Sequence, residues 1–251
     1  MTAPDPKTYQ ARPDLLAGRV ILVTGAGDGI GRAAAASFAA HGAAVVLLGR
    51  TTSRLESLYG EIRAAGHPEP GIAVLDLARA QGPAYFDLER QIRERYGRLD
   101  GLLHNAGILG DRAPLEQYDI GTWQQVMHVN LTAPFVLTQM LLPLLRASAD
   151  ASVLFTSSSV GRHGKAYWGA YAVSKFGIEG LSQVLAEETQ GTTRIRVNCL
   201  NPGATRTRMR RRAYPGELPE SRPEPAAILA PYLYLMGPDS TGVTGQSFDC
   251  Q

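Results

Sequence analysis

The stretch that decides the fold is VILVTGAGDGIGR, residues 20–32. It opens with four apolar residues, continues through a turn with four glycines, and leads into an alanine-rich segment that ends near His41. Residues 20–23 therefore predict a buried strand, and residues 30–41 predict a helix. Glycines in such a turn let phosphate oxygens approach the amides that begin the helix. Strand, turn and helix in this order predict a dinucleotide site in the first βαβ unit.

Short apolar runs and helical patterns alternate along the rest of the chain. Further strands are expected at residues 44–48, 72–75, 102–104, 153–156, 195–200 and 247–249, and helices at about 53–65, 85–96, 123–145, 169–188 and 226–236. Strands that are apolar on both faces and separated by helices indicate a parallel, doubly wound sheet. We predict an α/β protein with a single Rossmann-like domain over residues 19–251, its sheet flanked by helices, after an N-terminal arm at residues 1–18.

One stretch breaks this alternation, at about residues 205–225. It is rich in Arg, Pro and Glu and shows little apolar periodicity. An irregular segment of this length inside a compact domain is more often functional than filler. We predict that it forms a substrate lid.

The composition is that of an ordinary folded protein. Of the 251 residues 44% are hydrophobic and 19% charged, and the formal charge of +2 gives no reason to invoke nucleic acid. Two cysteines, Cys199 and Cys250, indicate a reduced intracellular protein rather than a disulfide framework. The N-terminal stretch lacks an apolar signal region, and no stretch approaches the roughly 18 apolar residues that span a bilayer. We expect a cytoplasmic protein with no membrane or nucleic-acid partner and no metal site.

The residue after the second expected strand bears on the choice of cofactor. The strand ends in Leu47-Leu48-Gly49 and is followed by Arg50, with no acidic residue at the turn. A carboxylate at this place would accept from a free ribose 2′-hydroxyl, whereas an arginine suits a 2′-phosphate. NADP(H) is therefore favoured over NAD(H). The alternative is that Arg50 is an ordinary surface arginine.

Tyr171 and Lys175 form a pair with the spacing of a proton-transfer device. Four residues apart on a helix, they share one face, so the phenol and the ammonium can point to the same place. A free tyrosine keeps its proton until about pH 10, and a fixed positive charge beside it is expected to lower that pKa. The alternative is a chance pair on a solvated helix face. The neighbouring motifs decide between the two.

With these motifs in place, nearly the whole chain resembles the short-chain dehydrogenase/reductase family. The family's cofactor turn matches residues 24–31, its Asn-Asn-Ala-Gly element matches His104-Asn105-Ala106-Gly107, and its nicotinamide loop resembles residues 201–207. Ser158 lies 13 residues before Tyr171, as the family's catalytic serine does. Within the family, residues 156–162, residues 206–209 and the Phe248-Asp249 ending resemble the YciK-type bacterial oxidoreductases.

The resemblance implies a role for each matching residue. The expected catalytic residues are Asn130, Ser158, Tyr171 and Lys175. The expected cofactor-binding residues are Gly25, Gly27, Asp28, Gly29, Ile30, Gly31, Arg50, Asp76, Leu77, Asn105, Ala106, Gly107, Tyr171, Lys175, Pro202, Gly203, Thr205 and Thr207. Tyr171 would give or take the proton of the substrate oxygen, which Ser158 would hold and polarise. His104 departs from the family's first asparagine and is expected to be a hydrogen-bonded histidine at a strand end.

The resulting hypothesis is an NADP(H)-dependent enzyme that acts on a small carbonyl or alcohol substrate. The alternative is a dinucleotide-binding regulator or sensor without turnover, although a sensor needs only the cofactor turn. Five of the seven residues from Arg206 to Arg212 are arginines. They could bind an acidic or phosphorylated substrate, grip the cofactor pyrophosphate, or pair with Glu217, Glu220 and Glu224 on the surface. The resemblance also implies a homodimer or homotetramer, formed through the helices that carry Asn130 and Tyr171.

Overall fold

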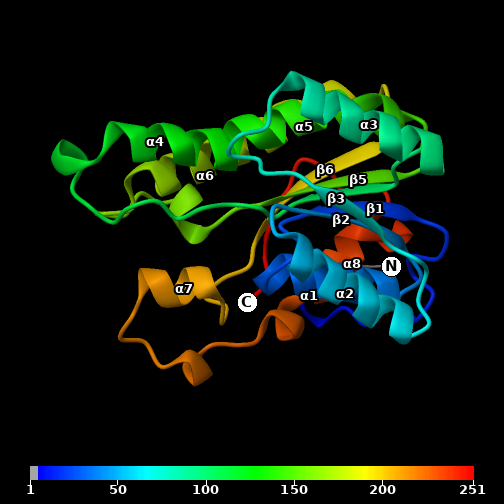
Figure 1. The fold of residues 1–251 in the computed structure, drawn as a ribbon, viewed down its shortest axis with the longest axis horizontal. Coiled ribbons are helices and arrows are strands. Elements are labelled where there is room, and N and C mark those ends of the chain that lie inside the picture. The colour runs from blue at the N-terminus through cyan, green and yellow to red at the C-terminus, as the bar shows by residue number, and fades with distance from the viewer. Residues whose placement is uncertain (1–4) are drawn as a thin grey trace.

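The computed structural model describes residues 5–251 as seven parallel strands covered by helices (Figure 1). The strands are β1 (Val20–Thr24), β2 (Ala44–Gly49), β3 (Gly71–Val74), β4 (Gly101–His104), β5 (Ala151–Thr156), β6 (Ile195–Asn201) and β7 (Ser247–Asp249). Their order in the sheet is β3-β2-β1-β4-β5-β6-β7, and every neighbouring pair is parallel. The chain thus winds outward from β1 in one direction and from β4 in the other. This confirms the predicted doubly wound sheet.

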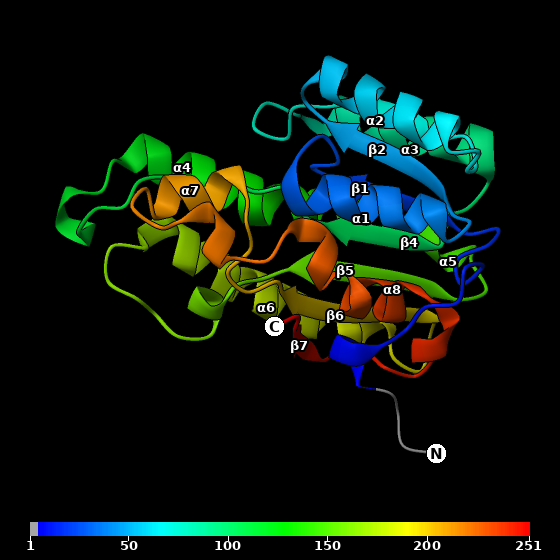
Figure 2. The same ribbon diagram turned by 90° about the horizontal axis from the view of Figure 1, so that it is seen from below.

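Helices cover both faces of the sheet. One face carries α1 (Gly29–Ala40), α2 (Thr52–Ala64) and α8 (Ala230–Met236), and the other carries α3 (Gly82–Tyr96), α4 (Ile120–Met127), α5 (Ala133–Arg146) and α6 (Gly169–Thr189) (Figures 1 and 2). Short helices fill several connections: η1 (Pro6–Thr8), η2 (Leu115–Gln117), η4 (Ser159–Gly161), η5 (Pro219–Ser221), η6 (Pro225–Ile228) and η7 (Pro238–Ser240). This three-layer arrangement gives the apolar faces of all the strands a helical partner.

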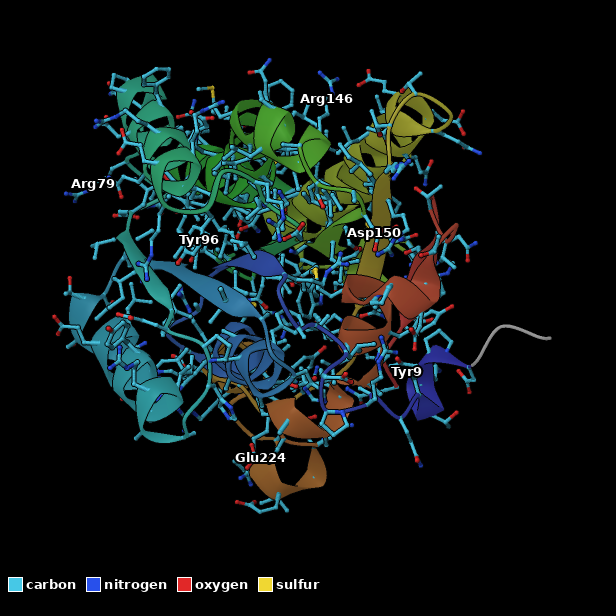
Figure 3. The ribbon with its side chains drawn as sticks, turned by 90° about the vertical axis from the view of Figure 1, so that its right-hand side faces the viewer. Tyr9, Arg79, Tyr96, Arg146, Asp150 and Glu224 are labelled. Carbon is cyan, nitrogen blue, oxygen red and sulfur yellow. The ribbon has the colours of Figure 1, made fainter. Side chains whose placement is uncertain are left out.

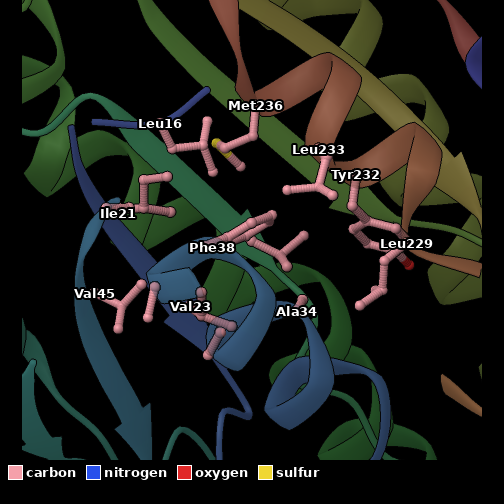
Figure 4. Close-up of a cluster of buried hydrophobic side chains, with 14 of the residues drawn as sticks. Leu16, Ile21, Val23, Ala34, Phe38, Val45, Leu229, Tyr232, Leu233 and Met236 are labelled. Atoms are coloured by element: carbon pink, nitrogen blue, oxygen red, sulfur yellow. The ribbon is translucent and has the colours of Figure 1, made fainter. Parts of the chain in front are cut away.

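Two apolar cores lie on opposite faces of the sheet. On the α1 face, Phe38 is fully buried between β1 and α8, and Tyr232 and Met236 pack into the same cluster (Figure 4). On the other face, Leu137 and Leu141 of α5 pack with residues of β4 and β5. Burial on both faces is why the strands read as continuous apolar runs rather than as alternating ones.

The predicted helix at about 123–145 is a helical run of three parts. It consists of α4, a π-helical segment η3 (His128–Thr132), and α5. The run Ile120–Arg146 has 27 residues and a mean hydropathy of 1.3 in its most apolar window, so it could cross a membrane by length and composition alone. The expectation that no stretch approaches such a span was therefore wrong. Half of that window is buried inside the protein, as in the core helix of a compact domain.

The amino edge of the sheet is closed by an ion-pair network. Asp150, just before β5, accepts from Arg19 at 3.0 Å and from Arg196 at 3.0 Å (Figure 3). On the same side of the molecule, the hydroxyl of Tyr9 donates to Asp239 at 2.7 Å. In the described residues 5–18 the arm is thus packed down, and residues 1–4 lie outside the described part. The motifs expected to form the site lie at the opposite edge, after the carboxyl ends of the strands.

Candidate active site

The glycine turn lies between the carboxyl end of β1 and the start of α1. Gly25 and Gly29 have φ values of 70° and 53°, which glycine adopts at little cost. Asp28 caps α1, because its carboxylate accepts from the Gly29 amide at 2.8 Å. The next amides of the first helical turn, those of Ile30 and Gly31, have no intrahelical acceptor and suit an anion such as a phosphate.

The turn is held against the loop that follows β4. The Thr24 hydroxyl accepts from the amides of Asn105 and Ala106 at 2.9 and 3.0 Å, and the Asn105 side chain donates to the Thr24 carbonyl at 3.2 Å. A Cβ on Gly31 would overlap both the Asn105 side chain and the Gly25 carbonyl. Gly31 is therefore required for this close approach. It occurs between β1 and β4, the point at which the strand order reverses and where such sheets bind ligands.

Two further predicted cofactor residues follow β2 and β3. Arg50 comes directly after β2, is exposed, and forms no ion pair with any residue of the range 5–251. Asp76 follows β3 and accepts from the Ala78 amide at 3.1 Å, while the neighbouring Leu77 is buried. Both polar side chains thus lie at the carboxyl edge. Arg50 leaves a positive charge available at the end of β2.

Three elements bring Ser158, Tyr171 and Lys175 together. Ser158 follows β5 and precedes η4, whereas Tyr171 and Lys175 lie on the buried face of α6. The Ser158 side chain lies close enough to the Tyr171 phenol to lower its pKa. The Lys175 ammonium lies 5.6 Å from the centre of the Tyr171 ring and donates to the Thr156 carbonyl at 2.7 Å. The spacing of four residues therefore corresponds to a buried pair, not to a solvated face.

Burial controls the proton affinity of this pair. It raises the pKa of Tyr171 to about 12, and the nearby Ser158 side chain only partly opposes this. It also lowers the pKa of Lys175 to about 8, against the attraction of Glu179 and Cys199. The expectation that Lys175 lowers the pKa of the tyrosine was therefore wrong for the protein alone. Burial disfavours the charged phenolate, and this raises the pKa of Tyr171 more than Ser158 lowers it.

Asn130 lies in the π-helical segment and connects three elements. Its side-chain amide donates to the Ile108 carbonyl at 2.9 Å and to the Ser174 hydroxyl at 3.1 Å, and its oxygen accepts from the Ile108 amide at 2.8 Å. A Cβ on Gly107 would lie 3.3 Å from the Asn130 oxygen and 3.9 Å from the Lys175 ammonium. Asn130 thus links the loop after β4 to α6. π-helical turns of this kind are frequent at functional sites.

His104 is buried and hydrogen-bonded, as its expected role requires. Its ring stacks on Phe155 at 4.7 Å, and its Nε2 is 2.8 Å from the Thr138 hydroxyl. Burial and the charge of Lys175 lower the pKa of His104 to about 3. A histidine that stays neutral at physiological pH packs under the site and carries no proton to the substrate.

The loop after β6 brings the predicted nicotinamide contacts beside the glycine turn. Pro202 and Gly203 follow the strand directly, and Thr205 is buried. Thr207 caps the short helix α7 (Arg208–Ala213), and a Cβ on Gly29 would lie 3.4 Å from its methyl group. The sequence pattern did not predict α7, because its six residues carry too few apolar positions to show a period.

The arginine run on this segment is largely neutralised. Arg206 pairs with Glu224, Arg208 with Asp28, Arg210 with Glu217, and Arg212 with Asp111. Glu217 also accepts from Arg222, and the two guanidinium groups lower its pKa to about 2. Two of these acids, Glu217 and Glu224, are the expected surface partners. The other two, Asp28 and Asp111, belong to the cofactor turn and to the loop after β4.

Several contacts of the site had no signal in the sequence. Arg54 of α2 and Arg208 both pair with Asp28, at 2.9 and 3.4 Å, so three elements meet beside the turn. Arg112, in the loop after β4, donates to the Ala213 carbonyl at the end of α7. These contacts join segments far apart in the chain, so no local spacing of residues predicts them. Within residues 5–251, no group of three or more His, Cys, Asp or Glu side chains is arranged to hold a metal ion.

Comparison with known proteins defines the class. Residues 19–218 match the family model described as short chain dehydrogenase. The chain belongs to the short-chain dehydrogenase/reductase family, which confirms both the resemblance and the prediction of an oxidoreductase.

Three relatives show how far the similarity extends. The oxidoreductase YciK of Escherichia coli (strain K12) is 51% identical over 243 residues, which cover 97% of this chain and 96% of that protein. A short chain dehydrogenase from Pseudomonas syringae is 58% identical in structural alignment, with a TM-score of 0.96 over 97% of this chain and 98% of that one. A short chain dehydrogenase from Shigella flexneri, solved in complex with NADP, is 51% identical, with a TM-score of 0.93 over 96% and 100% of the two chains. The YciK-type resemblance is confirmed.

Replacing Gly31 by alanine tests the close approach of the turn to the loop after β4. The added methyl group overlaps Asn105 and Gly25, so we expect a loss of about 1–3 kcal/mol in the free energy of unfolding and weaker NADPH binding. Urea unfolding and a fluorescence titration with NADPH measure the two effects. Gly60→Ala is the matched control, since its Cβ meets open space on α2. NADPH binding as tight as that of the unaltered protein would contradict the prediction.

Proposed function

We propose that the protein is an NADP(H)-dependent oxidoreductase that transfers hydride between the nicotinamide and a carbonyl or alcohol substrate. The observation that carries this proposal is the convergence of Ser158, Tyr171 and Lys175 at the edge of the sheet that also holds the glycine turn. A screen of aldehydes, ketones and alcohols for NADPH oxidation or NADP reduction tests it.

The residues of the turn suit a dinucleotide with a 2′-phosphate. The free amides of Ile30 and Gly31 begin α1 and would bind the pyrophosphate. The guanidinium of Arg50, which forms no ion pair within residues 5–251, would bind the 2′-phosphate. The NADP complex of the Shigella flexneri relative supports this choice. When bound, NADPH supplies the hydride for reduction.

The proton state of the tyrosine favours its role as an acid. With a pKa of about 12, Tyr171 is a protonated phenol at neutral pH and can donate to the oxygen of a carbonyl that accepts hydride. Ser158 adds a second donor to the same oxygen. Lys175, protonated below a pKa of about 8, supplies a positive charge that stabilises the tyrosinate left behind. Asn130 keeps α6 and the loop after β4 in register for this transfer.

A regulator or sensor is the less favoured alternative. It would need the glycine turn but no adjacent serine, tyrosine and buried lysine beyond it. A buried lysine that gains no function is costly to maintain, because burial opposes its charge.

We further propose that residues 205–225 act as the substrate lid of the single domain 19–251. Both ends of α7 are tied to the site: Arg208 pairs with Asp28 of the cofactor turn, and the Ala213 carbonyl accepts from Arg112. A lid fastened at these two points covers the region beside Tyr171. Release of these contacts would open the way for substrate.

Exposed apolar side chains on α5 and α6 bear on self-association, and the two cysteines bear on location. Val173, Phe176 and Val184 form an exposed apolar stripe along α6, and Phe135 is exposed on α5. Apolar surface of this kind suits an interface between copies, so we propose a homodimer or homotetramer. Both cysteines are free, which supports a cytoplasmic location.

Replacing Tyr171 by phenylalanine separates chemistry from binding. We expect the NADPH dissociation constant to stay within about twofold and turnover to fall at least about 100-fold, because only the proton donor is lost. Steady-state kinetics and a binding titration measure both. Tyr167→Phe is the control, since Tyr167 is exposed nearby. Turnover that survives the Tyr171 change would refute the assigned role.

Replacing Arg50 by alanine tests the 2′-phosphate contact. We expect the NADPH dissociation constant to rise about tenfold or more, because a charge-assisted hydrogen bond to phosphate is lost, while NADH binding is unchanged. Titrations with both nucleotides give the ratio. Arg63→Ala on α2 removes an equal charge remote from β2 and is the control. Equal weakening of NADPH and NADH would count against the assignment.

The pH profile tests the state of Lys175. Its pKa is lowered by burial to about 8, so its positive charge is present below that pH and lost above it. We expect kcat/KM for NADPH-driven reduction to fall by about tenfold per pH unit above that value. In Lys175→Arg the charge persists, so any residual activity should not fall in this range. A wild-type profile that stays flat to about pH 10 would contradict the lowered pKa.

A further inference from the structure

Beside Tyr171 lies an aromatic cluster with a cation at its centre. The Arg112 guanidinium lies 4.8 Å from the centre of the Trp168 ring and 5.0 Å from that of Tyr214. The Trp168 ring in turn lies 5.6 Å from the Tyr171 ring. The cation is therefore one aromatic ring away from the proposed proton donor. It is also exposed, so a small molecule can reach it.

Charge pairing distinguishes Arg112 from four of the five arginines between Arg206 and Arg212. Arg206, Arg208, Arg210 and Arg212 each have a carboxylate partner. Within residues 5–251, Arg112 has none, and its one hydrogen bond goes to the neutral carbonyl of Ala213. Its remaining N–H groups are free to bind a planar anion, for which a guanidinium is well shaped.

Lys165 adds to the same positive surface. Its ammonium lies 3.4 Å from the Tyr214 hydroxyl and 5.9 Å from the centre of that ring. In the described part of the chain it too has no carboxylate partner. Two cations without a carboxylate partner in the described residues thus flank the Tyr214 ring, beside Arg210, which lies 3.8 Å from the ring centre and is paired with Glu217.

The rest of the cluster is apolar. Leu109, Val160, Met209 and Ala213 pack around Trp168 and Tyr171. The buried Trp168 Nε1 has no acceptor within the described residues. An apolar cluster with the Arg112 cation on one side and the Tyr171 phenol on the other suits a flat molecule with an anion opposite its reacting group.

We propose that Arg112 is the specificity-determining residue for a carboxylate on the substrate, and that the substrate class is the aldehyde and keto acids with a flat apolar body. The carboxylate pairs with Arg112 between Trp168 and Tyr214, and this places the carbonyl carbon near Tyr171. The chemistry is the hydride transfer of the proposed function, on which this inference rests. Its anion site can be tested without turnover.

The binding test uses benzoate and its neutral isostere benzamide on the NADPH-loaded protein, followed by calorimetry. We expect benzoate to bind at least about tenfold more tightly, and Arg112→Ala to remove that difference, since a charge-assisted bidentate pair is lost. Arg112→Lys should keep part of the preference, because the charge remains without the planar fork. Arg211→Ala is the control for net charge, since Arg211 is an exposed arginine of the lid. Benzoate that binds no better than benzamide, or a preference unchanged in Arg112→Ala, overturns the proposal.

The kinetic test compares 4-carboxybenzaldehyde with methyl 4-formylbenzoate, its neutral ester. We expect the acid to be preferred at least about tenfold in kcat/KM, through KM, and Arg112→Ala to remove that preference, whereas loss of the lid contact to Ala213 would change kcat/KM for both compounds alike. Turnover of both compounds without preference overturns the carboxylate site and leaves the proposed function intact. Arg112-dependent benzoate binding without turnover of either aldehyde supports the anion site and counts against the proposed function. Unchanged thermal unfolding of Arg112→Ala shows that its effects are local.

Discussion

The structure depends on a small set of hydrogen bonds at the point where β1 and β4 diverge. There the Thr24 hydroxyl accepts from two amides of the loop after β4, and Asn105 donates back to the Thr24 carbonyl. Diverging strands leave backbone groups without sheet partners, and a buried group without a partner is costly. Thr24 and Asn105 satisfy them and hold the glycine turn in place. Only glycine at position 31 leaves room for the Asn105 side chain, so the position of α1 depends on the same contact.

The same loop also holds in place the part of the site that contains Tyr171 and Lys175. Ile108 exchanges two hydrogen bonds with Asn130, and Asn130 donates to Ser174 on α6, one residue before Lys175. The π-helical segment makes this possible, since one widened turn directs the Asn130 side chain toward the loop. The glycine turn and α6, which carries Tyr171, are therefore connected through the loop after β4 by hydrogen bonds that hold each in place. A site built on such supports keeps its reacting groups aligned without help from the substrate.

The sequence predicted most of the fold because burial on both faces leaves a strong signal. The strands agree with the structure within about two residues, and the parallel, doubly wound arrangement follows from their alternation with helices. What it missed are contacts between distant segments and their electrostatic consequences. The Tyr171–Lys175 spacing predicted proximity correctly but the wrong direction of the tyrosine's pKa, because a spacing carries no measure of burial. Helix α7 and the pairing of Arg208 with Asp28 were likewise invisible to a local pattern.

The arginine run shows why charge in a sequence is a poor guide to where an anion binds. Affinity for an anion depends on the net electrostatic potential, to which the protein's own carboxylates contribute as well as its arginines. Four arginines of the lid each face a carboxylate, so a bound anion would have to compete with a partner already in place. Within residues 5–251, Arg112 contacts a carbonyl and two aromatic rings but no carboxylate, so its guanidinium is held in place without its charge being cancelled. A single oriented cation beside the reacting group therefore selects an anionic substrate better than a run of paired ones.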